Sequence, residues 1–86
     1  MRLKDVYIEE AVVEKIFGKH DVTREEIEEV LLLDEPKHFR TRAGRYLGIG
    51  FTERYISIIY ENRIGVAVVI TAYPSSQWQI RMYKRK

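Results

Sequence analysis

The chain has 86 residues, of which 45% are hydrophobic and 33% are charged, and its formal net charge is +2. This length predicts one domain spanning residues 1–86, and the composition supports a globular core. The absence of cysteine excludes disulfide frameworks and thiolate metal sites. No apolar run approaches the roughly 20 residues of a membrane span. Because the N-terminal stretch MRLKDVYIEE also lacks the apolar centre of a signal peptide, we expect a cytoplasmic protein without membrane association.

The two parts of the sequence carry opposite charge. Residues 1–36 hold five basic and eleven acidic residues, a net −6, whereas residues 37–86 hold ten basic and two acidic residues, a net +8. A basic half of this kind attracts polyanions such as RNA. In the other interpretation, acidic helices neutralise a basic sheet within one fold, and charge alone does not decide between the two.

Residues 2–8 fit either a short strand or the lead into a helix. From about Tyr7 to Lys19, five apolar residues at helical spacing predict an amphipathic helix. Its buried stripe would contain Ile8, Val12, Val13, Ile16 and Phe17. Lys19 and His20 then fall near its C-terminus, where positive charge is favourable.

A second helix is predicted to start at Thr23, because Glu26 three residues later completes a capping-box pattern. Its buried face would contain Ile27, Val30, Leu31 and Leu33, and its water-facing side Glu25, Glu28 and Glu29. The segment Asp34-Glu35-Pro36 ends the helix, since proline lacks an N–H and disfavours helix at the preceding residue.

Residues 45–73, RYLGIGFTERYISIIYENRIGVAVVITAY, contain three runs in which apolar residues recur at every second position. This pattern predicts three strands of an antiparallel meander. Breaks at Thr52-Glu53 and at residues 61–65 predict hairpins, in which Gly65 can take the positive φ that such turns need. Residues 37–44 fit a loop or a fourth strand. The expected fold is therefore α+β, with two N-terminal helices on one face of three to five strands and the other face open.

Residues 77–83 fit two interpretations. Trp78, Ile80 and Met82 alternate with polar residues, which favours a strand, and this is the preferred interpretation. Alternatively, Ser75 or Ser76 caps a last helix that carries Trp78 and Met82 on one side.

The sequence contains no GxxxxGK[ST] phosphate loop, no CxxC, no HExxH and no spacing that predicts a metal site. The side chains present suit RNA cleavage without metal or cofactor, a reaction that needs a base, an acid and cations around the phosphate. His20 is the best acid–base candidate, because a free histidine titrates near pH 6.5. It is otherwise a helix-end residue that interacts with the helix dipole. His38 is a weaker candidate and fits an ordinary exposed histidine.

Several other side chains fit contacts with RNA. Guanidinium groups match phosphate geometry, hydroxyls donate hydrogen bonds to phosphate, and aromatic rings stack on bases. The candidates are Arg45, Arg54, Arg63, Arg81, Thr71 and the tyrosines, Tyr73 and Tyr83 among them. Each has a structural interpretation as well: solvated strand ends for the arginines, a cross-strand pair for Thr71, and packing for the aromatic residues.

Residues 19–30 (KHDVTREEIEEV), 45–50 (RYLGIG), 54–60 (RYISIIY) and 69–74 (VITAYP) resemble BrnT-type toxins across roughly residues 7–74. The last segment also resembles the closing strand of the wider RelE/barnase/colicin-like ribonuclease toxins. The resemblance implies a RelE-like α+β fold, cofactor-free cleavage of RNA, and a cognate antitoxin that blocks the site. By position it implies that Lys19 and His20 are the family's KH pair. It likewise implies that Thr71 is the hydroxyl residue of the final strand and Arg45 a basic residue at the start of the first meander strand.

The leading hypothesis is an endoribonuclease toxin of a toxin–antitoxin system. Its catalytic residues would be Lys19, His20, Arg45, Thr71 and Arg81, and its substrate-binding residues Arg54, Tyr73 and Tyr83. The alternative is a non-catalytic RNA- or protein-binding module on the same scaffold. A third, structural hypothesis is a homodimer formed through an exposed sheet edge.

Overall fold

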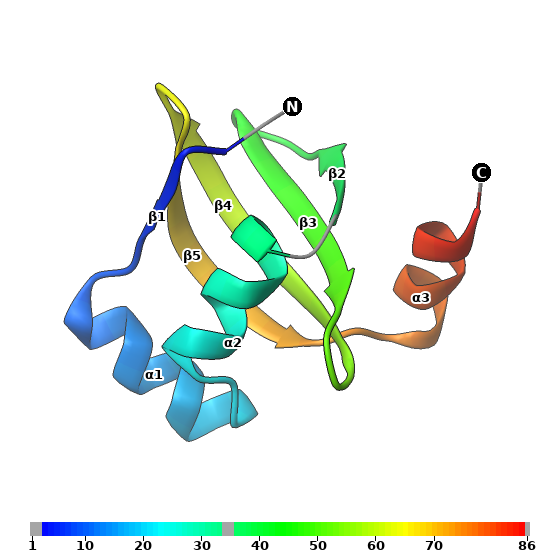
Figure 1. The fold of residues 1–86 in the computed structure, drawn as a ribbon, viewed down its shortest axis with the longest axis horizontal. Coiled ribbons are helices and arrows are strands. Elements are labelled where there is room, and N and C mark those ends of the chain that lie inside the picture. Colours follow the sequence, from blue (N-terminus) through cyan, green and yellow to red (C-terminus); the bar gives the residue numbers. More distant parts are fainter. Residues whose placement is uncertain (1–2, 34–35, 86) are drawn as a thin grey trace.

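The computed structural model describes residues 3–33 and 36–85, which form a five-stranded sheet in the order β1-β5-β4-β3-β2 with three α-helices (Figure 1). The elements in chain order are β1 (Asp5–Tyr7), α1 (Glu10–His20), α2 (Arg24–Glu28), the π-helical turn η1 (Glu29–Leu33), β2 (Lys37–Arg40), β3 (Arg45–Phe51), β4 (Tyr55–Arg63), β5 (Val66–Pro74) and α3 (Gln77–Lys84). The predicted α+β class, with two N-terminal helices against one face of the sheet, is confirmed. Within the described ranges, no helix is both long and apolar enough to cross a membrane.

Strands β2 to β5 form the predicted antiparallel meander, and residues 37–40 supply its fourth strand. The remaining strand, β1, pairs parallel with β5, with Asp5 opposite Val66 and Tyr7 opposite Val68. The sheet is therefore mixed, which the alternation within single strands does not reveal. Parallel neighbours require a long crossover, and here everything from α1 to β4 lies between the two paired strands.

The hairpin between β4 and β5 closes through Ile64 and Gly65 alone, because β4 continues to Arg63, beyond the start of the predicted break. Their φ angles are 54° and 84°, the pair of positive values that a two-residue type I′ turn requires. The prediction for Gly65 is confirmed. Ile64 is a β-branched residue in the left-handed region and its side chain is 92% exposed, so this turn is strained.

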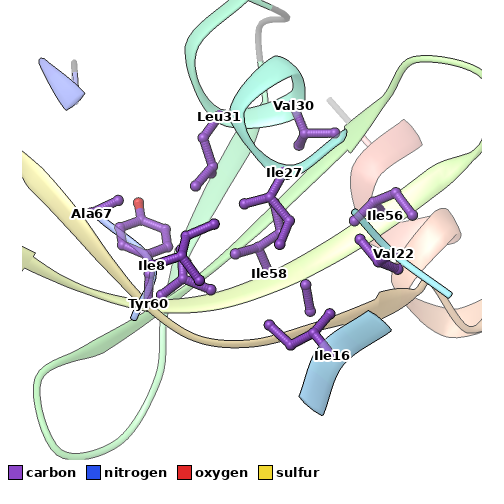
Figure 2. Close-up of a cluster of buried hydrophobic side chains, with 12 residues drawn as sticks. Ile8, Ile16, Val22, Ile27, Val30, Leu31, Ile56, Ile58, Tyr60 and Ala67 are labelled. Atoms are coloured by element: carbon purple, nitrogen blue, oxygen red, sulfur yellow. The ribbon is translucent and has the colours of Figure 1, made fainter. Parts of the chain in front are cut away.

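The core lies between the sheet and the helices α1 and α2. Figure 2 shows Ile56, Ile58 and Tyr60 of β4 meeting the side chains of the helices above them. The buried cluster consists of Ile8, Ile16, Val22, Ile27, Val30, Leu31, Ile56, Ile58, Tyr60, Ala67, Val69 and Ala72. Most of the predicted apolar stripes are in this cluster, which explains why the two helices form where the spacing predicted them.

The prediction of a buried position is wrong for two residues, Phe17 and Leu33. Phe17 is 52% exposed, since it borders a groove between α1 and the start of α2 and does not face the sheet. Leu33 is 81% exposed, because the second helix finishes in the π-helical turn η1. Its wider turn changes the angular step between residues and rotates Leu33 off the buried side that Val30 and Leu31 share.

The predicted start of the second helix is confirmed, because the Thr23 hydroxyl accepts a hydrogen bond from the Glu26 N–H at 3.2 Å. The Glu26 side chain does not complete the capping box, because both of its carboxylate oxygens accept hydrogen bonds from Arg54. For the predicted end of the helix, Asp34 and Glu35 lie outside the described residues.

The preferred strand interpretation of residues 77–83 is wrong, because they form α3, which Figure 1 shows apart from α1 and α2. A capping hydrogen bond starts this helix: the Ser76 N–H donates to Gln79 Oε1 at 2.9 Å. The residue that α3 buries is the polar Gln79, whereas Trp78 is 54% exposed. The alternation that favoured a strand was misleading, because the residue that the helix buries is an amide.

The second face of the sheet is not open along its whole length. Ser57 is buried there and donates a hydrogen bond to Gln79 Oε1 at 3.0 Å, so α3 covers one end of this face. Leu47 and Ile49 point to the same side as Ser57 and are also buried. The expectation of a wholly uncovered second face is therefore wrong.

Candidate functional site

Three of the predicted catalytic residues lie together at the edge of the sheet. Lys19 and His20 from the end of α1 and Thr71 from β5 border a hollow of about 270 Å³. We call it the α1–β5 hollow; its lining consists of Lys15, Ile16, Lys19, His20, Ile70 and Thr71. The hollow combines two ammonium groups, an imidazole and a hydroxyl over an apolar floor.

The short length of β1 leaves this part of β5 accessible. β1 pairs only with residues Val66 to Val68, and α1 lies against β5 beyond that point. The pairing of β4 with β5 also shifts, from Thr71 opposite Ile59 to Val69 opposite Tyr60, so Ile70 is an extra residue. Such a bulge redirects side chains locally, and here Ile70 lines the hollow beside Thr71.

The end of α1 holds Lys19 and His20 at the mouth of the hollow. Asp21 follows in the left-handed conformation at φ 57°, and its N–H bonds to the Phe17 carbonyl at 3.0 Å. This conformation stops the helix and is one that aspartate tolerates. Lys19 and His20 therefore lie in the last turn of α1, as predicted, beside the negative end of the helix dipole.

His20 packs on Tyr73, and Tyr73 is held by α3. The His20 and Tyr73 ring centroids are 5.9 Å apart with the ring planes inclined at 55°. The Tyr73 hydroxyl accepts a hydrogen bond from Gln79 Nε2 at 3.0 Å. Gln79 Oε1 accepts from the Ser57 hydroxyl and from the Ser76 N–H. A buried amide thus fixes the ring against which His20 lies.

Arg54, predicted to bind substrate, is paired within the fold. Its guanidinium donates to both carboxylate oxygens of Glu26 at 2.9 Å and to the Asp21 carbonyl at 2.6 Å. The hydrogen bond to Glu26 is the chief reason that the pKa of Arg54 is raised. The structure therefore places Arg54 behind the His20–Asp21 segment, where it ties the β3–β4 turn to the connection between α1 and α2.

Arg45 and Arg81, both predicted to be catalytic, do not line the hollow. Arg45 lies two strands away from β5 and forms an ion pair with Glu61 at 3.8 Å. Arg81 is exposed on α3, two residues past the buried Gln79 and hence on the opposite side of the helix. Arg63, also considered for phosphate, pairs with Glu61 at 3.0 Å.

Tyr83, the other predicted substrate-binding tyrosine, lies on α3 and contacts Tyr55 edge-on with a centroid distance of 5.5 Å. The Lys37 ammonium lies 5.5 Å from the Tyr83 ring centroid. Tyr83 is thus part of a separate aromatic group, outside the lining of the α1–β5 hollow.

Lys15 lines the hollow but is not among the predicted site residues. It precedes Lys19 by four residues, and residues at this spacing lie on the same face of a helix. The i, i+4 pair of lysines beside the predicted histidine is the pattern that would have identified it.

His38 belongs to a different cluster, on the core side of β2. Its Nδ1 is 2.5 Å from the hydroxyl of the buried Tyr60, and the Tyr60 ring also stacks with Tyr46 at a centroid distance of 5.7 Å. Burial lowers the pKa of His38, and burial together with Tyr46 raises the pKa of Tyr60 to about 12. His38 is therefore half-buried and hydrogen-bonded to Tyr60, which differs from the exposed histidine that the sequence suggested.

Within residues 3–33 and 36–85, no group of three or more histidine, cysteine, aspartate or glutamate side chains is arranged to hold a metal ion.

No protein-family model and no curated protein sequence matches the chain. Among solved structures, it is similar to the ribonuclease toxin BrnT of Brucella abortus, with a TM-score of 0.70 and 23% sequence identity. The match covers 85% of this chain and 97% of the BrnT chain. The fold expected from the resemblance to BrnT-type toxins is therefore confirmed, and at this identity the likeness concerns the fold alone.

Proposed function

We propose that this chain is the toxin of a toxin–antitoxin pair and that it cleaves RNA in the α1–β5 hollow. The observation that carries the proposal is the meeting of Lys19, His20 and Thr71 around one hollow, from segments far apart in the sequence. The BrnT-like fold supports the same conclusion, because the structure that it resembles is that of a ribonuclease toxin.

In the proposed reaction His20 acts as the base. Its neutral imidazole takes the proton of a ribose 2′-hydroxyl, and the 2′ oxygen attacks the adjacent phosphorus. The bond from phosphorus to the 5′ oxygen of the next nucleotide breaks, and that oxygen takes up a proton from water. The His20 imidazolium then releases its proton to the hydroxide left behind, which restores the neutral base. The products are a 2′,3′-cyclic phosphate and a free 5′-hydroxyl. No metal or cofactor takes part in this scheme.

The cations of the hollow stabilise the additional negative charge that the phosphate carries in the transition state. Lys19 and Lys15 project from successive turns of α1, which lets both ammonium groups approach the same phosphate. Thr71 donates a hydrogen bond to a phosphate oxygen. The Tyr73 ring limits the orientations that His20 can adopt, since it is itself fixed by Gln79.

The proposal includes a protein antitoxin that covers the hollow and keeps RNA out of it. The setting would be the cytoplasm, where both RNA and such a partner are present. Association of two copies of the chain through a sheet edge stays a prediction, and light scattering on the purified protein would test it.

The decisive experiment compares His20→Ala with His38→Gln, a matched substitution of the histidine outside the hollow. End-labelled RNA is incubated with each protein in the presence of a metal chelator, and folding is checked by circular dichroism. We expect His20→Ala to cleave at least about 100-fold more slowly, which is the usual contribution of a general base. His38→Gln should cleave like the wild type. Unchanged cleavage by folded His20→Ala would remove His20 from the mechanism.

A growth assay separates the toxin from the non-catalytic module. Induced expression of the wild type should arrest growth, whereas His20→Ala should not. If the wild type binds RNA but neither cleaves it nor arrests growth, the chain is a binding module and the nuclease proposal is wrong.

A further inference from the structure

A second group of aromatic side chains lies outside the α1–β5 hollow. Phe51 and Tyr55, at the two ends of the β3–β4 turn, have ring centroids 4.7 Å apart, and Tyr55 lies 5.5 Å from Tyr83 of α3. We call these three residues the aromatic row. Phe51 is 44% exposed, and the other two are partly exposed. The row is thus partly exposed and takes one residue each from β3, β4 and α3.

Lysine side chains lie over this row. The Lys84 ammonium is 5.7 Å from the Tyr55 ring centroid, and the Lys37 ammonium is 5.5 Å from that of Tyr83. Lys37 is also held in place by a 2.6 Å hydrogen bond to the Arg85 carbonyl. Residues 74–86 contain basic residues but no acidic one, so α3 brings positive charge to the row, whereas Glu53 is an acidic residue of the turn between Phe51 and Tyr55.

The row begins next to the ring that supports His20. Tyr73 pairs with Ser57 across β4 and β5, and Tyr55 is the next residue of β4 that points to the same side. Diagonal neighbours of this kind lie about 7–8 Å apart. The Tyr73 hydroxyl is also bonded to Gln79 of α3, the helix that contributes Tyr83. The hollow and the row are therefore linked through Tyr73 and α3.

We propose that the aromatic row is a stacking subsite for unpaired bases of an RNA strand whose scissile phosphate occupies the α1–β5 hollow. This inference rests on the proposed function and adds the substrate class, which is single-stranded RNA. Aromatic rings interleaved with cations are the usual means of binding single strands without sequence readout, because every base has a face that stacks.

The charges favour RNA over a protein partner. A base that stacks on Tyr55 or Tyr83 displaces a lysine from the ring face, and the displaced ammonium then lies beside the phosphate of the same nucleotide. A phosphate follows each base of RNA, so each lysine keeps a partner. Duplex RNA cannot use the row, since its bases are already stacked and paired.

The test measures binding of a fluorescein-labelled decauridylate by fluorescence anisotropy in the His20→Ala background, in which RNA stays intact. Adding Tyr83→Ala should weaken binding about tenfold, which lies in the range found when one stacking ring is removed. Tyr83→Phe keeps the ring and should bind normally. Tyr7→Ala, which removes an exposed tyrosine from β1, is the matched control and should also bind normally. If Tyr83→Ala does not fold, Phe51→Ala in the exposed turn tests the same row.

The outcomes are distinct for the two proposals. Unchanged decauridylate affinity in both Tyr83→Ala and Phe51→Ala overturns the subsite, even if His20→Ala abolishes cleavage. Equal loss of affinity in the Tyr7→Ala control, or equal affinity for a ten-base-pair RNA duplex, overturns it as well. If these variants lose a protein partner but keep RNA affinity, the row is a protein interface. If the row binds the oligonucleotide as expected but the wild type never cleaves RNA, the subsite stands and the nuclease function fails.

Discussion

The ring of His20, the last residue of α1, lies 5.9 Å from the ring of Tyr73 near the end of β5. This contact joins two segments that are far apart in the sequence, because α2 and the strands β2 to β4 lie between them. Through Tyr73, the contact connects His20, the proposed base, to Gln79 of α3. The orientation of His20 therefore depends on residues that never contact it.

Tyr73→Phe separates the two contributions of Tyr73. The variant keeps the ring against His20 but removes the acceptor of the Gln79 amide. An unsatisfied buried donor costs about 1–3 kcal/mol, so we expect the free energy of unfolding in urea to fall by about 1–2 kcal/mol. RNA cleavage should be less affected than in Tyr73→Ala, in which His20 loses its neighbour. Equal stability of Tyr73→Phe and wild type would contradict the role of this hydrogen bond. Tyr7→Phe serves as the exposed control.

Arg54→Ala should destabilise the protein by about 1 kcal/mol, because it removes the two-pronged contact with Glu26 and the hydrogen bond to Asp21. The matched control is Arg24→Ala. Arg24 forms a single exposed contact with Glu10 at 2.8 Å, and we expect its removal to change stability by less than about 0.5 kcal/mol. A double-mutant cycle of Arg54→Ala with Glu26→Gln measures the coupling directly. Zero coupling would show that the guanidinium is not held by Glu26.

Stability should fall as the pH drops below about 6.5, in part because of His38. Burial lowers the pKa of His38 in the folded state below the unfolded value of 6.5. Between the folded pKa and 6.5, His38 of the unfolded chain binds a proton that His38 of the folded chain does not, so acid favours unfolding. The loss is complete once the pH lies below the folded pKa. Unfolding of the wild type and of His38→Gln is compared in urea from pH 7 to pH 5. The free energy of unfolding should depend less steeply on pH in the variant, since glutamine can hydrogen-bond to Tyr60 without titrating. Parallel curves would exclude this contribution.

Ile64→Asn should raise stability by about 1 kcal/mol. The φ of 54° at Ile64 strains a β-branched residue, whereas asparagine followed by glycine is the preferred pair for this two-residue turn. Because the Ile64 side chain is almost fully exposed, its replacement removes no core packing. Ile64→Val retains the branched side chain, so its midpoint temperature of thermal unfolding should not rise. A gain of the same size in Ile64→Val would point to side-chain size in place of backbone strain.

The meander was predictable because each of its strands carries its own alternation and its own turn residue. Ile56, Ile58 and Tyr60 recur at every second position, and Gly65 marks the hairpin before the structure is known. The helices α1 and α2 were predictable from spacing and from the cap at Thr23. These features are local, and local patterns are what one sequence contains.

The features that sequence reasoning missed depend on contacts between distant segments. α3 buries the polar Gln79 against Ser57, and its own sequence does not reveal this contact. Phe17 follows the apolar stripe of α1 but borders the groove between α1 and α2, where it is half exposed.

In the candidate site too, the local part was predictable from the sequence and the contacts between distant segments were not. Lys19 and His20 are adjacent in the chain, and the structure adds Thr71 to them through the docking of α1 on β5. Arg45 and Arg81 have the appropriate chemistry but lie elsewhere, because residue type carries no information about position.

The parallel pairing of β1 with β5 has a consequence for synthesis on the ribosome. β1 is translated before its partner residues Val66–Val68 of β5, and the other three strands of the described sheet lie between them in the sequence. Non-local pairings of this kind are slow to form and cannot begin before both partners exist. A nascent chain that has not yet reached β5 therefore contains α1 and His20 but neither Thr71 nor Tyr73, so incomplete translation products would be expected to be inert.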